Sequence, residues 1–190
     1  MIRILLRIAT VLVLVAMAVV VLWYAELLVW PVQRDAAMAP TIPACDGRVV
    51  AEGLTFKLRS PRSGDVVAIH AAESLDGEVT PDPDADDLTL LLRVAAEPGD
   101  EVVGRDGSVF INGVKFDDVA TKPFPRVELL GDQYFVLGDN SSASVDSRDF
   151  GPILEGAIFA RALFVVWPLR DFGLLRHDDS EAPLGKVDCG

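Results

Sequence analysis

The stretch "DEVVGRDGSVFING", residues 100–113, holds two short apolar runs, and a turn signal follows each of them. The signals are Asp106-Gly107 and Asn112-Gly113, dipeptides that tight hairpin turns favour because both central residues adopt a positive φ. Short apolar runs bounded by such turns are typical of β-strands. The stretch therefore predicts antiparallel strands joined by hairpins.

The same pattern extends over most of the chain beyond Trp30, which predicts a mainly β protein with one antiparallel β domain. The apolar runs are "RVVAE", "GDVVAIHA", "LTLLLRVA", "DEVVG", "SVFING", "QYFVLGDN" and "AIFARALFVVWPL". The 190 residues suffice for one membrane anchor and one domain of about 150 residues. We expect the β domain at residues 31–170, behind residues 1–30 and before a tail at 171–190.

The head of the chain predicts a membrane-spanning helix. In "IATVLVLVAMAVVVLWYA", residues 8–25, Thr10 is the only polar side chain before the aromatic end. Such a helix spans roughly 27 Å, close to the hydrocarbon thickness of a bilayer. Arg3 and Arg7 precede it, so the positive-inside rule puts the N-terminus in the cytoplasm and the main domain outside. This predicts a single-pass protein of the cell membrane.

A cleaved secretory signal is the competing interpretation of the same segment. The tripeptide Ala16-Met17-Ala18 has the small-x-small form of a cleavage site. The apolar run continues past that tripeptide and is longer than a normal signal core, which favours the anchor.

Charge and cysteine content exclude several classes of function. The net charge is -12, which leaves no basic footprint for a phosphate backbone, so nucleic acid is not an expected partner. Cys45 and Cys189 do not have metal-ligand spacing, and whether they pair stays open. We expect neither a metal nor another cofactor.

Residues 73–87 predict an exposed acidic loop. The segment holds seven acidic residues and no basic one, and Pro81 and Pro83 exclude a core strand. Its "DPDADD" resembles a calcium-binding loop, but Asp87 occupies the place of the required glycine and Arg93 that of the bidentate glutamate. A solvated run of charge is the better interpretation.

Four ordered segments together resemble the type I signal peptidases. The longest is "GDNSSASVDSRDFGPI" at 138–153, which is similar to the Gly-Asp-Asn, Ser-x-Asp-Ser-Arg and Gly signature of that family. The others are "LLLRVAAEPGDEV" at 90–102, "SPRSGDVVAI" at 60–69 and "AAMAPTI" at 36–42. The resemblance implies a membrane-anchored β domain that meets the signal peptides of exported precursors.

The residues that the resemblance assigns to catalysis are replaced. In the family, a serine before Met-x-Pro is the nucleophile, and a lysine before Arg-Val is the general base; these positions are Ala37 and Leu92. A serine that supplies an oxyanion hydroxyl in many members corresponds to Asp35, whose carboxylate would repel the developing anion. The two histidines, His70 and His177, do not occupy the base position. The sequence predicts a catalytically inactive homologue.

The scaffold of the family site is retained, with Met38, Pro40, Asp139, Ser144, Asp146 and Arg148 in place. The resemblance implies that Ser144 orients the missing lysine and that Asp146 and Arg148 brace the site as an ion pair. With Leu92 at the base position, a structural role in holding the turn is favoured for all three. Ser141 stands where the family usually has arginine, so the bracing is expected to be thinner.

Three functions remain open at this stage. An inactive homologue could still bind an extended peptide by strand addition beside residues 31–34 and 89–91, which needs only main-chain hydrogen bonds. An active peptidase with a displaced nucleophile at Ser141, Ser142 or Thr41 would need a base, and the sequence supplies none within reach. The third alternative is a structural subunit of a membrane complex.

Overall fold

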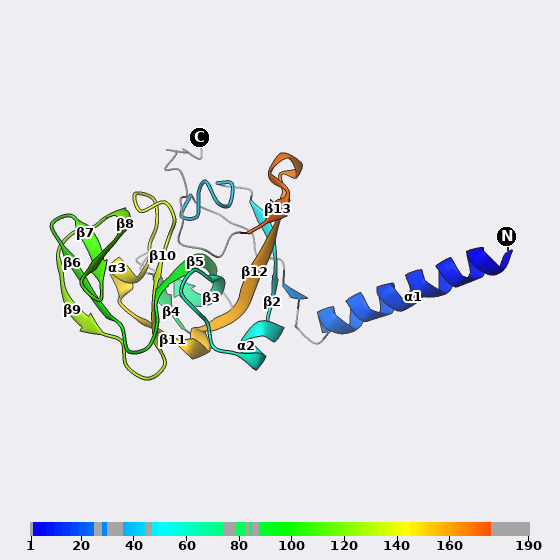
Figure 1. The fold of residues 1–190 in the computed structure, drawn as a ribbon, viewed down its shortest axis with the longest axis horizontal. Coiled ribbons are helices and arrows are strands. Elements are labelled where there is room, and N and C mark those ends of the chain that lie inside the picture. Colours follow the sequence, from blue (N-terminus) through cyan, green and yellow to red (C-terminus); the bar gives the residue numbers. More distant parts are fainter. Residues whose placement is uncertain are drawn as a thin grey trace.

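The computed structural model describes residues 2–24, 28–29, 36–44, 47–73, 79–82, 84 and 88–175. A long helix, α1 (Ile2–Tyr24), projects from a β body (Figure 1). Its segment Arg3–Val21 has a mean hydropathy of 2.9 and no part of it is buried against the body. This length and composition fit a membrane anchor, and they fit a signal sequence as well.

The body contains a large antiparallel sheet, which confirms the predicted fold class. Its strand order is β1-β2-β12-β3-β5-β10-β11, with β13 paired to β12 and β4 paired to β3. The strands are β1 (Leu28–Val29), β2 (Arg48–Glu52), β3 (Val66–Glu73), β4 (Val79–Pro81), β5 (Leu88–Ala96), β10 (Gln133–Leu137), β11 (Ile153–Leu154), β12 (Ile158–Trp167) and β13 (Gly173–Leu174). β3 lies at the centre and pairs with β5 from Val66↔Arg93 to Ala71↔Leu88.

A second, four-stranded sheet is formed by β6 (Glu101–Arg105), β7 (Ser108–Ile111), β8 (Val114–Ala120) and β9 (Phe124–Glu128) in the order β8-β7-β6-β9. The two hairpin turns predicted from residues 100–113 are present. Asp106, Gly107, Asn112 and Gly113 have φ values of 53°, 74°, 51° and 79°. These are the left-handed conformations that the Asp-Gly and Asn-Gly dipeptides favour.

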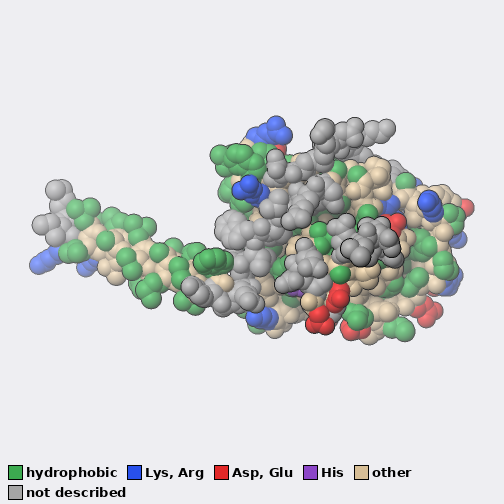
Figure 2. Space-filling view, turned by 180° about the vertical axis from the view of Figure 1, so that it is seen from behind, with side chains coloured by type: hydrophobic (Ala, Val, Ile, Leu, Met, Phe, Trp, Pro, Cys, Tyr) green, Lys and Arg blue, Asp and Glu red, His purple; other side chains and the backbone are tan. Residues whose placement is uncertain are grey.

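Three buried apolar clusters hold the body together. One joins Met38 and Ile42 to β2, β3 and β12, a second joins β3, β5 and β10 around Leu92, and a third joins β5 and β10 to the small sheet around Phe135. Short helices complete the fold: α2 (Leu54–Leu58), α3 (Ser147–Phe150), η1 (Glu155–Ala157) and η2 (Leu169–Asp171). The space-filling view shows acidic and basic side chains over the surface of the body (Figure 2).

Two segments differ from the sequence-based expectation. The predicted acidic loop at 73–87 contains a strand, because β3 runs on to Glu73 and pairs with β4 at Ala71↔Pro81 and Glu73↔Val79. Proline is tolerated in β4 because this short strand pairs, among the described residues, with β3 alone. Beyond residue 170, β13 pairs with β12 and Leu175 is buried in the core.

Candidate functional site

The nucleophile position lies in a turn that is fixed to the core. Ala37, Met38 and Ala39 are 3%, 0% and 1% exposed. The amide of Ile42 donates to the Met38 carbonyl at 2.8 Å, and the amide of Asn140 donates to the Ala37 carbonyl at 2.8 Å. The buried Met38 fixes the turn to the core, and the hydrogen bond from Asn140 fixes it to the Gly-Asp-Asn segment. The side chain of Ala37 is only a methyl group. Pro40, by contrast, is exposed.

The base position lies within an apolar cluster. Leu92 is 1% exposed on β5 and belongs to a cluster with Val67, Val94, Tyr134 and Val136. Surroundings of this kind lower the pKa of a buried lysine, because desolvation disfavours its charged form. Leucine fills the same space without a titratable group, so the apolar environment remains while the proton acceptor is absent.

Gly138 brings the candidate residues together. A Cβ on Gly138 would collide with Ser144 Oγ, and it would lie 2.7 Å from the Ala37 carbonyl oxygen. The pair Leu137↔Arg93 joins β10 to β5, and continuing this antiparallel register by one residue brings Gly138 level with Leu92. Ala37 and Ser144 therefore meet at one glycine, which has to lack a side chain for the two to approach, and Leu92 lies on the neighbouring strand.

Ser144 has an unpartnered hydroxyl. Among the described residues, its Oγ is the buried side-chain polar atom that has no hydrogen-bond partner. A buried hydroxyl without a partner costs about 1–3 kcal/mol, and such groups are rare in folded proteins. The retained serine thus faces a place where nothing accepts or donates a hydrogen bond.

An ion pair joins the strand of the base position to the Gly-Asp-Asn segment. Arg93 Nε and Nη2 donate to the two carboxylate oxygens of Asp139 at 2.8 and 2.7 Å, and Arg93 Nη1 donates to the Gly64 carbonyl at 2.9 Å. Thr41 Oγ1 donates to the same Asp139 carboxylate at 2.5 Å. Asp139 thus joins Arg93 on β5 to Thr41 in the turn of the nucleophile position.

The second ion pair is the one that the resemblance implied. Arg148 Nε and Nη2 donate to both oxygens of Asp146, whose side chain is fully buried, at 2.8 and 2.7 Å. Burial alone would lower the pKa of Arg148, but the hydrogen bonds and charge of Asp146 raise it above its ordinary value. Asp146 also accepts from the Gly138 amide at 3.0 Å and caps α3, in a capping box with Asp149.

Arg148 extends this bracing to other segments. Its Nη1 donates to the carbonyl of Ala120 at the end of β8 at 2.6 Å and to the carbonyl of Ser141 at 2.9 Å. The ion pair therefore connects the small sheet to the turn that carries Ser144. The Ser141 backbone takes part, although its side chain has replaced the usual arginine.

The remaining candidates lie apart from this centre or outside the described residues. His70 pairs with Thr89 on β5, three residues before Leu92 and thus about 10 Å along the strand, and its ring stacks on Phe159 at 4.0 Å. Ser142 Oγ donates to Asn140 Oδ1 at 2.8 Å. Asp35, residues 31–34, His177, Cys45 and Cys189 fall outside the described residues, within which no cluster of metal-ligating side chains occurs.

Sequence reasoning missed the pairing of Arg93 with Asp139 and the role of Gly138. Both residues of the ion pair stand in the quoted motifs, and a charged residue inside the apolar run of β5 was a signal that a partner was needed. The closeness of Gly138 to Ser144 and Ala37 depends on the meeting of three segments, which spacing alone does not give.

Comparisons with known proteins agree with the motifs. A family model described as signal peptidase, peptidase S26, matches residues 4–167. A probable signal peptidase I-2 of Synechocystis is 32% identical over 149 residues, which cover 76% of this chain and 65% of that protein. Subunit 1b of the mitochondrial ATP-independent inner membrane protease of Arabidopsis thaliana is 32% identical over 139 residues, covering 73% of this chain and 70% of that protein.

Among solved structures, a signal peptidase I of Enterococcus faecalis is 26% identical and has a TM-score of 0.39, with 53% of this chain and 94% of that chain covered. The chain spans a little under two thirds of the length of the Synechocystis relative.

Proposed function

We propose that this chain, which belongs to the signal peptidase family (peptidase S26), is a membrane-anchored member that binds extended peptides of exported precursors without cleaving them. The observation that carries the proposal is the composition of the centre around Gly138. Ala37 and Ser144, whose hydroxyl has no partner, lie against Gly138, and the base position on the neighbouring strand is the leucine side chain of Leu92.

The chemistry of the family needs a nucleophile and a base at this centre. A serine hydroxyl attacks only when a neighbouring base takes its proton, and Ala37 and Leu92 supply neither group. Loss of the nucleophile alone costs a serine protease about 10⁶-fold in turnover, and the further losses are not additive because the groups act as a unit. Cleavage by the family mechanism is therefore expected to be undetectable.

Peptide binding does not depend on these groups. The pairs of β10 with β5 run from Ala96 to Arg93, while the preceding part of β5, Leu88–Leu92, pairs among the described residues with β3 alone. An extended peptide can add to such a free edge through main-chain hydrogen bonds. Leu88, Thr89 and Leu90 are half-buried, which leaves room for contacts with small side chains of a peptide.

Titration of a labelled precursor peptide with Ala-x-Ala before its cleavage site would test the proposal on the full chain in detergent. Saturable binding and an intact peptide after long incubation are expected. A peptide of the same sequence with N-methylated backbone amides is the matched control, since it has the same side chains and cannot pair with a strand edge. Binding of both peptides alike would contradict strand addition, and binding of neither would favour a structural subunit.

Membership of the family favours a second candidate, an active signal peptidase that uses another nucleophile. Of the three candidate nucleophiles Ser141, Ser142 and Thr41, the last two already donate to side chains of the Gly-Asp-Asn segment. Cleavage of the precursor by the unmodified chain, abolished by Thr41→Val or Ser142→Ala, would establish this candidate and overturn the first.

A further inference from the structure

A stacked pair of rings lies near one end of the free edge of β5. The ring of His70 on β3 stacks on the ring of Phe159 on β12, with their centroids 4.0 Å apart. His70 also pairs directly with Thr89 on β5. Because the strand order is β12-β3-β5, the three residues form a row across the sheet. This row leads from the stacked rings to the edge at which we expect a peptide.

A β-bulge turns Phe159 toward His70. The register of β12 with β3 shifts between Ile158 and Ala160, and Phe159 is the residue at the shift. Ile158 lies in one buried cluster, whereas Phe159 packs against another cluster, which contains Ala160. In a regular strand, Phe159 and Ala160 would point to opposite faces. Bulges re-aim side chains in this way and are frequent beside functional sites.

The face of the sheet that carries these rings differs between its two ends. Leu91 shares this face with Thr89, because it is two residues further along β5. At the end near the nucleophile position, Leu91 and Met38 are 3% and 0% exposed and pack in the same cluster. At the other end, His70, Thr89 and Phe159 are each half-buried. A large side chain of a ligand is therefore accommodated better at the His70 end.

An aromatic side chain of a peptide on β5 can reach these rings. Such a peptide would lie two strand spacings from β3, which is about 10 Å. Phe159 covers one face of the His70 ring, and the other face lies on the side of β5, where the side chain of Thr89 is short. An alanine of the peptide would end above Thr89, whereas an aromatic ring would extend to His70.

The charges at this end of the sheet favour an uncharged ring over an acidic side chain. The amide of Asp82 donates to the His70 carbonyl at 3.1 Å, and Asp84 follows two residues later. These carboxylates would repel an acidic residue of a peptide. A lysine would be attracted by them, but its charge would have to leave water to lie on two half-buried rings.

We propose that His70 and Phe159 bind an aromatic side chain of the precursor peptide, before its Ala-x-Ala and on the same face as the two alanines. This inference rests on the proposed function, since the peptide has to pair with β5. β10 occupies the edge from Arg93 onward, so the peptide extends from the inactive centre toward Leu88. Because every second residue of a strand shares a face, the nearest suitable position is the second residue before the first alanine.

Titration of two labelled peptides against the full chain in detergent tests the proposal. One peptide has phenylalanine at the second residue before Ala-x-Ala. The matched peptide has the same composition, with the phenylalanine one residue closer to the alanines and thus on the opposite face. The first should bind about fivefold more tightly, the scale of one aromatic pair. His70→Ala should bring this ratio to about one, and so should Thr89→Leu, which fills the space beside the His70 ring.

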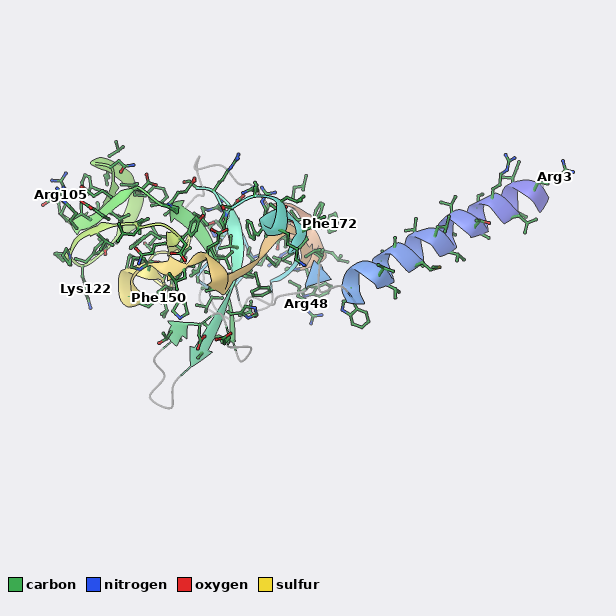
Figure 3. All side chains as sticks on the ribbon, turned by 90° about the horizontal axis from the view of Figure 1, so that it is seen from below. Arg3, Arg48, Arg105, Lys122, Phe150 and Phe172 are labelled. Carbon is green, nitrogen blue, oxygen red and sulfur yellow. The ribbon has the colours of Figure 1, made fainter. Side chains whose placement is uncertain are left out.

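Phe110→Ala is the matched control variant. Phe110 is a half-buried ring in the small sheet, with the guanidinium of Arg105 4.3 Å from its centroid. Figure 3 shows Arg105 at the end of the body that is far from α1. The ratio of the two affinities should be unchanged in this variant, because the small sheet does not contain β3, β5 or β12.

Three outcomes would overturn the proposal in different ways. Equal binding of the two peptides by the unmodified chain would refute the aromatic site and leave the proposed function standing. Binding of neither peptide would overturn both. If a peptide with lysine at the same position bound more tightly than the phenylalanine peptide, the assignment to an uncharged ring would be wrong.

Discussion

At the scale of single residues, Ser144 is costly to the fold because its buried hydroxyl has no partner. We expect Ser144→Ala to stabilise the protein by about 1 kcal/mol, since the change removes an unsatisfied group and leaves no new one. Thermal unfolding of the full chain in detergent, followed by circular dichroism, would measure the shift.

Ser147 supplies the matched control for this measurement. Its Oγ is also buried, but it accepts a hydrogen bond from the Val136 amide at 3.0 Å. Ser147→Ala should destabilise the protein by about 1–3 kcal/mol, because it leaves that amide unpaired. If Ser144→Ala destabilised to the same extent, the Ser144 hydroxyl would have a partner after all, and the site would not be the emptied one described above.

A second residue-scale prediction concerns restoration of cleavage. Ala37→Ser alone should do nothing, since a serine there has no base. Adding Leu92→Lys should give at most trace cleavage of an Ala-x-Ala precursor, because Ser144 could then orient the lysine. Asp35→Ser in addition should raise the rate by about 10²-fold, the scale of one oxyanion donor. A gel shift of the precursor, with the unmodified chain as control, measures each step.

Two outcomes would contradict this account. Cleavage by the unmodified chain would refute the inactive site directly. An inert triple variant would show that the three replacements are not the whole reason for inactivity, so that the peptide groove has changed as well.

The motifs predicted the family, which the comparisons confirm, and they include Ala37 and Ser144, which lie against Gly138. This was possible because the motifs keep residues with structural roles, such as Met38 in the core and Asp146 as the N-cap of α3. The roles assigned to Ala37 and Leu92 stay predictions. The sequence could not show that the Ser144 hydroxyl lacks a partner, because this depends on how the segments that carry Ala37, Gly138 and Ser144 pack together.

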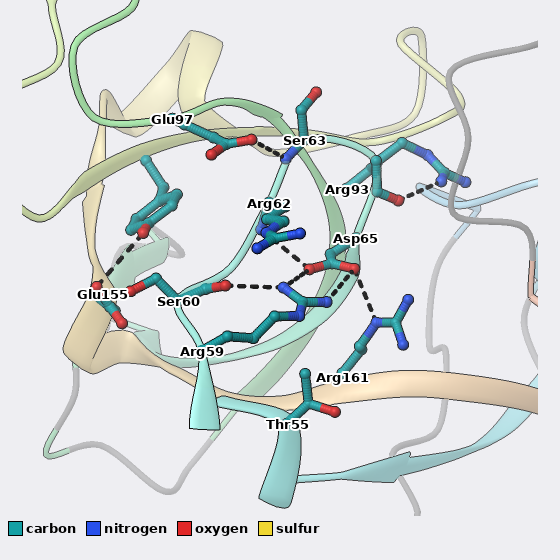
Figure 4. Close-up of polar contacts among 12 residues, drawn as sticks. Thr55, Arg59, Ser60, Arg62, Ser63, Asp65, Arg93, Glu97, Glu155 and Arg161 are labelled. Carbon is teal, nitrogen blue, oxygen red and sulfur yellow. Dashed lines mark hydrogen bonds and ion pairs between the residues drawn. The ribbon is translucent and has the colours of Figure 1, made fainter. Parts of the chain in front are cut away.

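At the scale of elements, Asp65 ties α2, β3 and β12 together (Figure 4). Arg59 donates to both oxygens of Asp65 at 2.7 and 3.1 Å, and Arg161 Nε donates at 2.8 Å. Burial works against ionisation of Asp65, but the bonds from Arg59 and the Arg62 amide, with the charge of Arg161, bring its pKa below the ordinary value. This junction fixes the start of the central strand.

Asp65→Asn should therefore destabilise the body by about 2–3 kcal/mol at neutral pH, less than a fully buried pair loses because both arginines are partly exposed. Because the pKa of Asp65 is lowered in the folded state, its contribution is complete above about pH 4 and disappears as the pH falls through the folded value. Urea unfolding at neutral and acid pH measures both effects. If the difference in the free energy of unfolding between wild type and variant did not become smaller in acid, the stabilising role of ionised Asp65 would be contradicted.

Strands with strong local signals were predicted and others were not. The 100–113 hairpins were found because Asp-Gly and Asn-Gly fix the turn geometry from two residues alone. β8, with polar and charged positions, and β9, with a proline at position 125, have no continuous apolar run and are strands because neighbours pair with them. β4 was also not predicted, because Pro81 favours a loop unless the strand lies at the edge of a sheet.

At the scale of the whole molecule, the direction of the anchor decides which compartment the β body occupies. Arg3 and Arg7 precede the apolar part of α1, so the N-terminus should remain in the cytoplasm and the body should be exported. The strongly acidic body is consistent with this, because the rule concerns lysine and arginine beside the span and not the net charge of a large domain.

In a bacterial host, a C-terminal alkaline phosphatase fusion should be active, and a reporter that works only in the cytoplasm should be inactive at the same junction. Reversal of the two signals would refute this topology, whereas a mature N-terminus near Val19 would identify a cleaved signal. An Arg3→Glu, Arg7→Glu variant is the internal control, since removing the flanking charge should weaken or invert the orientation while the apolar segment stays the same.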